Sequence, residues 1–153
     1  MLWNELDKDL IFVNLKIEEK EELLRNLCKT LEQKGYVKET FAEAVLEREQ
    51  QFPTGVWVGD VGVALPHSVA EHVYTSKIAI AVLERPVFFH QMDAEQTIPV
   101  HVIFLLAIAE NEKHLLCLEQ LVELIQDTDV MKRIIQAKNA DEILQIIREK
   151  ENA

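Results

Sequence analysis

VHVIFLLAIA, at residues 100–109, is the stretch that decides the fold of this chain. It is rich in β-branched residues, and the same composition returns in VGVAL at 61–65 and in SKIAIAVL at 76–83. Short apolar runs of this kind are typical of strands that are covered on both faces. We therefore expect these three segments to form the centre of a sheet.

The segment that separates the last two of these runs is less regular. PVFFHQMDAEQTIP, at 86–99, contains two prolines and mixes polar with apolar residues. Proline cannot donate a hydrogen bond to a neighbouring strand and is confined to edges, strand starts and bulges. We expect an edge strand and a loop here.

Two amphipathic helices are predicted before the sheet. IEEKEELLRNLCKTLEQK, at 17–34, is followed by Gly35, the residue type that helix C-termini favour. A second helix is predicted from 38 to 50, with Arg48 near its C-terminal end, and FPTG at 52–55 ends it. The inward-facing residues are expected to be Leu23, Leu24, Leu27, Cys28 and Leu31 in the first helix and Phe41, Val45 and Leu46 in the second.

The helical period returns after Ala109 in three segments. They begin near Asn111, Asp127 and Asn139, which are all good N-cap residues, and Asn139 to Glu142 resembles a capping box. The residues expected to line these helices are Leu115, Leu118, Leu121, Val122 and Ile125, then Val130, Ile134 and Ile135, then Ile143, Leu144 and Ile147.

Helices before and after a strand-rich centre predict an α/β sandwich with helices on both faces of the sheet. The length of 153 residues is that of one domain with a sizeable core. We find no internal repeat, low-complexity segment or linker. We therefore expect a single domain over residues 1–153.

Composition restricts the partners and the compartment. Lys and Arg total 16 against 27 Asp and Glu, a formal charge of −11, which disfavours duplex nucleic acid or an anionic membrane and favours a protein partner. MLWNELDKDL, at 1–10, lacks the basic start and long apolar run of a signal peptide, and no run approaches ~18 uninterrupted apolar residues. Cys28 and Cys117 show no pairing pattern, so we expect buried free thiols and a reducing cytoplasm.

His67 follows a proline at the end of the first central run. Pro66 fixes its own φ, lacks an N–H, and pushes Leu65 towards extended geometry, so the strand should end here. His67 then lies at a strand terminus, where α/β sheets place ligand sites, although a histidine there can equally be structural.

His114 strengthens the case for a site. If Asn111 caps the following helix, His114 lies in the first helical turn, near the positive end of the helix dipole. There it tends to stay neutral near pH 7. Because VHVIFLLAIA leads into this helix, we expect His67 and His114 to emerge at the same edge of the sheet.

Several chemistries lack their usual motifs. Zinc would need a ligand pair such as HExxH, which the five histidines do not form. His90 and His101 fall in predicted strands, and His72 lies five residues after His67, a poor spacing for sharing a helix face. No GxSxG, P-loop or GxGxxG is present, which disfavours a serine hydrolase and nucleotide binding. Histidine as a covalent phosphoryl acceptor remains, since neutral imidazole can accept on one nitrogen while a hydrogen bond holds the other.

Two separated motifs carry a family resemblance. REQQFPTGVWVGDVGVALPH, at 48–67, and NEKHLLCLEQLVELIQD, at 111–127, resemble the fructose/mannitol-type enzyme IIA domains of the bacterial phosphoenolpyruvate-dependent sugar phosphotransferase system. The resemblance covers nearly the whole chain. It implies the type-2 enzyme IIA fold, with a central mixed sheet in an α/β/α sandwich.

The resemblance also implies a function and its residues. The phosphorylated histidine of the family maps onto His67, the second histidine onto His114, and the arginine of the RE pair onto Arg48. Phosphohistidine on HPr would donate to His67, which would pass the group to a cysteine of enzyme IIB, before sugar is phosphorylated during transport by the membrane protein IIC. The family implies Nε2 as the phosphorylated nitrogen and no metal or cofactor.

Chemistry is consistent with these roles. Phosphoryl transfer mainly needs positioning and charge stabilisation, which a hydrogen bond from His114 and the forked donors of Arg48 would supply. Arg48 can equally be a surface arginine at a helix end. We also expect a shallow apolar recess around His67, lined by Val63, Leu65 and Phe52, where a partner docks and water is excluded.

Some features bear on the subgroup. Ser68 stands where fructose and mannitol members often have glycine, and its hydroxyl would bond the phosphoryl group or cap the following turn. FPTG together with His67 and His72 resembles the galactitol-type subgroup, so the expected substrate is a polyol such as galactitol. Two alternatives stay open: a regulatory module like the nitrogen-type IIA paralogues or regulator-attached IIA-like domains, and an unrelated α/β binding domain whose histidines are structural.

Overall fold

The protein is described by a computed structural model that covers residues 6–152. The start of the segment that lacks signal-peptide character, residues 1–5, lies outside the described residues. Five strands form one mixed sheet in the order β1-β4-β5-β3-β2. β1 pairs with β4 and β3 with β5 in parallel, whereas the β4–β5 and β2–β3 pairs are antiparallel. The strands are β1 (Leu6–Leu15), β2 (Gly55–Val58), β3 (Val61–Ala64), β4 (Lys77–His90) and β5 (Thr97–Ala107).

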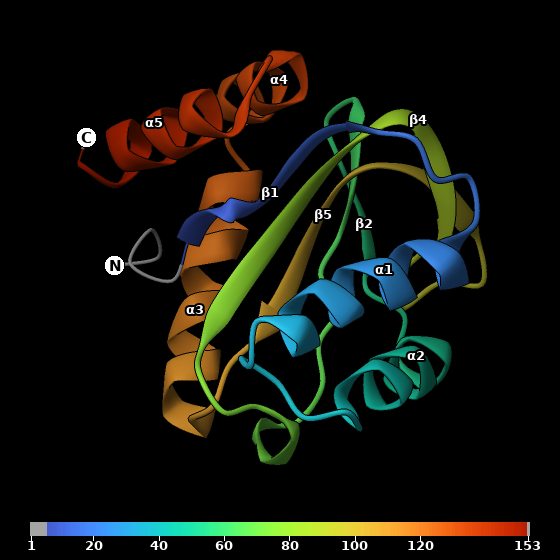
Figure 1. Cartoon of the computed structure of the whole chain (residues 1–153). Coiled ribbons are helices and arrows are strands. Elements are labelled where there is room, and N and C mark those ends of the chain that lie inside the picture. Colours follow the sequence, from blue (N-terminus) through green and yellow to red (C-terminus); the bar gives the residue numbers. More distant parts are fainter. Residues whose placement is uncertain (1–5, 153) are drawn as a thin grey trace.

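Helices cover both faces of this sheet (Figure 1). One apolar core joins α1 and α2 to one face, and a second core joins α3, α4 and α5 to the other. The predicted α/β/α sandwich is therefore confirmed. The helices are α1 (Lys20–Gln33), α2 (Phe41–Gln51), α3 (Asn111–Ile125), α4 (Thr128–Gln136) and α5 (Ala140–Glu151), and a short 3₁₀ helix, η2 (Ala70–His72), lies between β3 and β4.

The three apolar runs that predicted the centre of the sheet are its inner strands, β3, β4 and β5, as expected. Their side chains alternate between the two cores. Phe104 and Leu106 of β5 lie in the core with α3, and Leu105 and Ala107 lie in the core with α1. Burial on both faces explains why these strands are apolar throughout.

The sequence did not predict the two edge strands, β1 and β2, and it placed the end of β4 too early. β1 has two exposed charged residues near its start, Lys8 and Asp9, and two register shifts against β4, so its sequence shows no clean alternation. β2 has only four residues. The separate edge strand expected within 86–99 is instead the second half of β4, which continues to His90 past a register shift between Val82 and Val87. Pro86 lies within that irregularity, where a missing N–H is tolerated.

The two helices before the sheet form as predicted. All five expected residues of α1 are buried, as are Phe41 and Val45 of α2, while Leu46 is half-buried. Gly35 follows α1 and adopts a positive φ of 78°. Its backbone N–H donates to the carbonyl of Glu32, and the backbone N–H of Tyr36 donates to the carbonyl of Leu31. These two bonds form a Schellman motif, which satisfies the last carbonyls of the helix.

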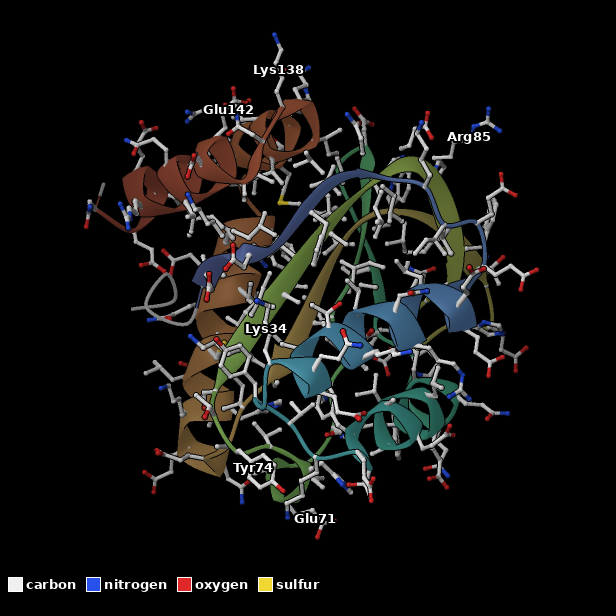
Figure 2. The ribbon with its side chains drawn as sticks, in the orientation of Figure 1. Lys34, Glu71, Tyr74, Arg85, Lys138 and Glu142 are labelled. Carbon is white, nitrogen blue, oxygen red and sulfur yellow. The ribbon has the colours of Figure 1, made fainter. Side chains whose placement is uncertain are left out.

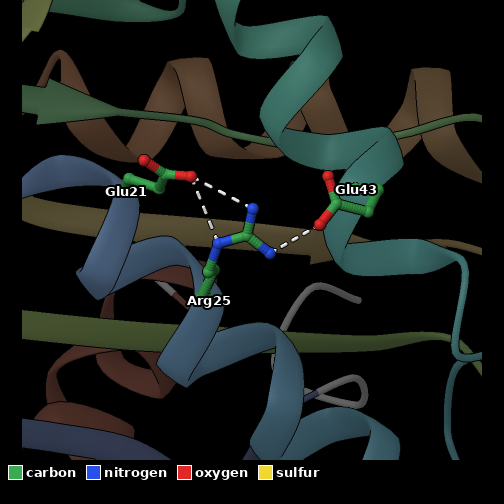
Figure 3. Close-up of polar contacts among 3 residues, drawn as sticks. All are labelled: Glu21, Arg25 and Glu43. Carbon is green, nitrogen blue, oxygen red and sulfur yellow. Dashed lines mark hydrogen bonds and ion pairs between the residues drawn. The ribbon is translucent and has the colours of Figure 1, made fainter.

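An exposed ion-pair cluster joins α1 to α2. Arg25 of α1 contacts Glu21 of its own helix at 3.0 Å and Glu43 of α2 at 2.6 Å, as Figure 3 shows. A hollow of about 650 Å³ between the two helices is lined in part by Arg25, Glu43 and Glu49. Exposed ion pairs of this kind contribute little to stability, so the buried face of each helix holds the pair together.

The phase of α3 differs from the prediction. Leu121 and Ile125 are buried and Leu118 is half-buried, but Leu115 and Val122 are 62% and 41% exposed. Their expected places in the core are taken by Cys117 and Leu124. The helix is apolar around more than half of its circumference, so docking against the sheet, and not periodicity alone, selects the buried stripe.

The caps of the last two helices confirm the predicted starts. Asp127 accepts from the N–H of Val130, and Asn139 accepts from the N–H of Glu142. Glu142 reaches back to the N–H of Lys138, one residue before the position that a capping box uses. Both residues lie at the end of the molecule formed by α4 and α5 (Figure 2). The expected inward residues of α4 and α5 are buried or half-buried.

Cys28 and Cys117 are both buried and form no disulfide, as expected. They lie in the cores on opposite faces of the sheet. Burial raises the pKa of Cys28 to about 12, so its thiol stays protonated. Among residues 6–152, no helix combines the length and apolar character needed to cross a membrane.

Candidate functional site

The parallel pairing of β3 and β5 brings His67 to the edge of the sheet where α3 begins. Both strands run in the same direction, so their carboxyl ends meet there. Beyond β3 the chain stays attached to β5, because Leu106 donates to the carbonyl of Pro66 at 2.9 Å and His67 forms an isolated bridge with Leu106. The start of α3 and the β3–β4 connection lie together at the lower edge in Figure 1.

The ring of His67 is held at both nitrogens. Its Nδ1 lies 2.8 Å from the carbonyl oxygen of Leu65, and the Nε of Arg48 donates to its Nε2 over 3.3 Å. A carbonyl can only accept and a guanidinium can only donate. Both contacts therefore require the tautomer with the proton on Nδ1, which leaves a lone pair on Nε2.

His114 lies beside His67, as expected from the two motifs. The ring centroids are 4.9 Å apart and the rings are tilted by 54°. The N-cap of α3 is Glu110, one residue before the expected Asn111, and the N–H of His114 makes the first helical bond to its carbonyl. His114 nevertheless lies in the first turn, near the positive end of the helix dipole.

Arg48 completes the cluster from the last turn of α2. Its guanidinium carbon lies 5.2 Å from the ring centroid of Phe52, and its Nε reaches His67. The three residues predicted for the site, His67, His114 and Arg48, thus come together from three different elements. Stacking on Phe52 restricts the side chain of Arg48 and leaves its other N–H groups for an anionic group.

Both histidines are held neutral. Burial lowers the pKa of His67 below its usual 6.5; the bond to the Leu65 carbonyl opposes this shift and the charge of Arg48 adds to it. The pKa of His114 is lowered by burial, then by the proximity of His67 and Arg48. At pH 7 the site therefore offers uncharged imidazoles next to one fixed positive charge.

The remaining histidines make contacts elsewhere. In η2, the Nδ1 of His72 lies 2.7 Å from the hydroxyl of Thr40 and its Nε2 lies 3.5 Å from Glu71, whose side chain points outward (Figure 2). His101 accepts from the N–H of Gly62 through Nδ1, and His90 is exposed at the end of β4. Within residues 6–152 no group of three or more His, Cys, Asp or Glu side chains is arranged to hold a metal ion.

Ser68 is buried, and its hydroxyl donates to the carbonyl of Val69 at 3.2 Å. This is a local bond within the connection after β3. Ser68 does not cap the turn that follows, because the N-cap of η2 is Val69 and has no side-chain bond. A bond from Ser68 to the phosphoryl group stays a prediction.

The recess expected around His67 is lined differently from the prediction. Val63 is fully buried and Leu65 is 4% exposed, so neither can contact a partner. Phe52 is 60% exposed, as the prediction requires. It belongs to a set of exposed apolar side chains that follow Arg48, His67 or His114 within four residues in the sequence, which we call the apolar rim: Phe52, Val69, Leu115 and Leu116.

Two polar residues near the site escaped sequence reasoning. Glu49 and Thr54 are each 4% exposed, and the carboxylate of Glu49 accepts from both the N–H and the hydroxyl of Thr54. A signal was present, because Glu49 follows Phe41 and Val45 at intervals of four and so falls on the buried face of α2. A carboxylate on an apolar face needs partners, which is a reason to search for a polar network.

A family model described as "Phosphoenolpyruvate-dependent sugar phosphotransferase system, EIIA 2" matches residues 4–150. It covers both motifs, all five strands and the helices, apart from the last residue of α5. The family predicted from the two motifs is therefore confirmed.

Three relatives are similar over most of the chain. The fructose-specific EIIABC component of Bacillus subtilis is 30% identical over 94% of this chain and 22% of that protein. The galactitol-specific EIIA component of Escherichia coli K12 is 27% identical over 76% of this chain and 78% of that protein. The nitrogen regulatory protein of Bradyrhizobium diazoefficiens is 30% identical over 91% of this chain and 89% of that protein. The chain therefore spans only a small part, 22%, of the fructose-specific relative.

Solved structures share the fold. A PTS IIA (PtxA) from Streptococcus mutans superposes with a TM-score of 0.80 at 20% identity, covering 99% of this chain and 94% of that one. The IIA mannitol of Escherichia coli superposes with a TM-score of 0.74 at 25% identity, covering 92% of this chain and 97% of that one. The matching chain in a complex of IIA mannitol with phosphorylated IIB mannitol from Escherichia coli superposes with a TM-score of 0.76 at 24% identity, covering 94% of this chain and 96% of that one.

Proposed function

This chain belongs to the EIIA 2 family of the phosphoenolpyruvate-dependent sugar phosphotransferase system, and from that premise we propose that it is a phosphocarrier that uses His67. It accepts a phosphoryl group from phosphohistidine on HPr and passes it to a cysteine of enzyme IIB, in the cytoplasm. The observation that carries the proposal is the fixed tautomer of His67, with Nδ1 on the Leu65 carbonyl and Nε2 facing Arg48.

Acceptance of the group is a displacement at phosphorus. The lone pair of Nε2 forms the new N–P bond while the N–P bond of the donor histidine breaks, and that electron pair stays on the donor imidazole. The ring of His67 becomes more positive as the bond forms. Because its Nδ1–H donates to the carbonyl of Leu65, this charge is stabilised on the ring.

Transfer onwards reverses these bond changes. A cysteine thiolate attacks phosphorus, the Nε2–P bond breaks, and its electron pair returns to Nε2 of His67. The thiolate is the competent nucleophile of a cysteine, so IIB has to supply it deprotonated. Nothing in this sequence of steps requires a metal ion, because no pyrophosphate is cleaved.

Arg48 and His114 stabilise the transferred group. In the transition state negative charge is spread over the three equatorial oxygens of the phosphoryl group. Arg48 provides permanently charged, forked donors once its bond to Nε2 is replaced, and the dipole of α3 adds positive potential near His114. His114, neutral at rest, donates one ring N–H to an oxygen.

The apolar rim is the proposed docking surface for HPr and for IIB. Phe52 and Leu116 are 60% and 53% exposed, and they follow Arg48 and His114 closely in the sequence. Covering them excludes water from a phosphohistidine that water would otherwise hydrolyse. The solved complex of a mannitol IIA with phosphorylated IIB supports a IIB partner of this kind.

The transported compound is proposed to be a sugar or a polyol, with galactitol as one candidate. The galactitol-specific EIIA is 27% identical to this chain and the fructose-specific protein is 30% identical, so identity does not favour galactitol over fructose. Phosphate transfer to purified IIB proteins of the fructose, mannitol and galactitol classes decides between them. The fastest acceptor identifies the class.

A regulatory role is the second candidate. The nitrogen regulatory protein of Bradyrhizobium diazoefficiens matches this chain over 91% of this chain and 89% of that protein, so the two have similar lengths. The same phosphohistidine would then control binding to another protein. Phosphate uptake from HPr without transfer to any of the three IIB classes is the result that favours regulation.

The proposal is tested by incubating the protein with phosphoenolpyruvate, enzyme I and HPr and measuring its intact mass. We expect one acid-labile phosphate on the wild type, none on His67→Ala, and slower incorporation on His114→Ala. Circular dichroism of each variant controls for folding. If the wild type stays unmodified under conditions that phosphorylate another IIA, the phosphocarrier proposal is wrong.

A further inference from the structure

We propose that Glu49 and Thr54 are positioning residues for His67. They fix the backbone of Leu65, whose carbonyl holds the Nδ1 proton, and thereby keep Nε2 as the attacking nitrogen. This inference rests on the proposed function, since it concerns how His67 is prepared to accept a phosphoryl group. It assigns a task to two buried polar residues that the chemistry described above does not use.

The network begins at a carboxylate with two fixed partners. One oxygen of Glu49 accepts from the backbone N–H of Thr54 at 2.8 Å, and the other accepts from the hydroxyl of Thr54 at 2.7 Å. Both residues are nearly inaccessible to solvent. The end of α2 is therefore tied to the loop before β2 by two largely buried hydrogen bonds, which are costly to leave unmade.

The hydroxyl of Thr54 extends this constraint to Leu65, the residue that follows β3. Because its single proton goes to Glu49, its lone pairs face the other way, and one of them accepts from the N–H of Leu65 at 3.1 Å. A threonine hydroxyl can donate only once. The carboxylate of Glu49 thus determines which way the hydroxyl of Thr54 points.

Leu65 connects the network to the reactive ring. Its N–H is bound by Thr54, and its carbonyl lies 2.8 Å from Nδ1 of His67. The next residue, Pro66, has a fixed φ and offers its carbonyl to Leu106. The backbone from Leu65 to His67 is held on both sides, so the Leu65 carbonyl stays aimed at one ring nitrogen.

A glutamine at position 49 cannot reproduce this arrangement. Its amide has one oxygen, which can accept from the N–H or the hydroxyl of Thr54 but not from both with the same geometry. The amide NH₂ would donate to the Thr54 hydroxyl and turn its proton away. Glu49→Gln therefore keeps the shape of the side chain and disturbs the direction of the hydrogen bonds.

The test uses the unphosphorylated protein and reads the tautomer of His67 from the chemical shifts of its ring nitrogens by NMR. The variants are Thr54→Val, Thr54→Ser, Glu49→Gln and Glu43→Gln. Thr54→Val removes the hydroxyl, Thr54→Ser retains it, and Glu43→Gln is a matched control for the same charge change at an exposed position of α2. The rate of phosphate uptake from HPr is measured in parallel.

We expect a single Nδ1–H tautomer in the wild type, Thr54→Ser and Glu43→Gln. Thr54→Val and Glu49→Gln should give a mixture of the two tautomers, and phosphate uptake should slow about ten- to a hundredfold, as small displacements of a reacting group do. The inference is overturned if folded Thr54→Val keeps the single tautomer and the wild-type rate. In that case the network only stabilises the fold.

Two further outcomes, a variant that does not fold and a wild type that accepts no phosphate, can be told apart. If Thr54→Val does not fold, the near-isosteric Glu49→Gln decides the question, because an unchanged tautomer in that variant also rejects the inference. If the wild type accepts no phosphate, the proposed function fails, but the tautomer measurement still tests whether the network positions His67. A failure of one claim is therefore not mistaken for a failure of the other.

Discussion

Which nitrogen of His67 carries the proton determines what that residue can do. The Leu65 carbonyl holds the proton on Nδ1, and Arg48 faces the lone pair of Nε2. Pro66 and His67 could be singled out in the sequence because a strand must end there. The partner of Nδ1 could not, since it depends on the backbone geometry of two preceding residues.

His67 should titrate below its usual value, and Arg48 should be one reason. We expect the NMR titration midpoint of His67 to lie below 6.5 in the wild type and to rise in Arg48→Ala, because the guanidinium charge disfavours imidazolium. The exposed Arg25→Ala serves as a control with no shift. A midpoint that falls in Arg48→Ala would show that the charge of Arg48 does not act on the ring.

The pH dependence of phosphate uptake follows from the same shift. Only the neutral ring has a lone pair on Nε2, and a lowered pKa keeps the ring neutral to more acidic pH. The rate of uptake by this chain should therefore decline on acidification through the pKa of the folded protein, with a midpoint below 6.5. Rapid-quench measurements with pre-formed phospho-HPr, controlled for donor stability, test this. A decline that is complete above pH 6.5 contradicts it.

At the scale of elements, the inner strands and the buried faces of α1 and α2 are predictable because burial imposes a strong pattern on them. β1 and β2 are not, since an edge strand with register shifts and a four-residue strand carry little pattern. The phase of α3 is ambiguous in the sequence for the opposite reason. Its apolar residues surround too much of the helix for periodicity to select one stripe.

A pair of substitutions tests the observed phase of α3. Leu121 is fully buried, so Leu121→Ala should lower the free energy of unfolding by about 2–5 kcal/mol. Leu115 is 62% exposed, so Leu115→Ala should change it by no more than about 0.5 kcal/mol. Urea unfolding followed by circular dichroism measures both. Equal losses at the two positions would mean that the helix is rotated.

Gly62 of β3 marks a close approach between strands. A Cβ at this position would overlap the carbonyl of Pro99 in β5, and backbone atoms cannot move aside as a flexible side chain can. Gly62→Ala should therefore destabilise the protein by about 1–3 kcal/mol or more. Gly35→Ala, at a position with no neighbour within 4 Å but a positive φ, separates steric overlap from backbone strain. A Gly62→Ala variant as stable as the wild type would contradict the strand spacing.

At the scale of the whole molecule, one sheet joins two apolar cores and holds the site at one edge. His67 belongs to the β3 side, His114 to α3 on one face and Arg48 to α2 on the other. The site therefore exists only when both layers are packed. Sequence motifs predicted its three residues. The spacing of Phe41, Val45 and Glu49 marks Glu49 as inward-facing, but its bonds to Thr54 and the contact of Thr54 with Leu65 are seen only in the folded chain.

We propose that the chain unfolds as a single cooperative unit. Leu24 lies in one core and Leu121 in the other, and both contact the same sheet. Alanine at either position should shift one common unfolding transition in urea, seen at the same midpoint by circular dichroism and by tryptophan fluorescence. Two separated transitions, each sensitive to only one of the substitutions, would show that the layers fold independently.

The proposed role of His67 is tested most sharply by locating the phosphoryl group on the ring. The protein, isotope-labelled at its histidine ring nitrogens, is phosphorylated through enzyme I and HPr, and NMR detects which ring nitrogen is coupled to phosphorus. We predict coupling at Nε2 of His67, with Nδ1 still protonated and bound to the carbonyl of Leu65. Phosphorus on Nδ1 of His67, or on His114 in place of His67, would contradict the account.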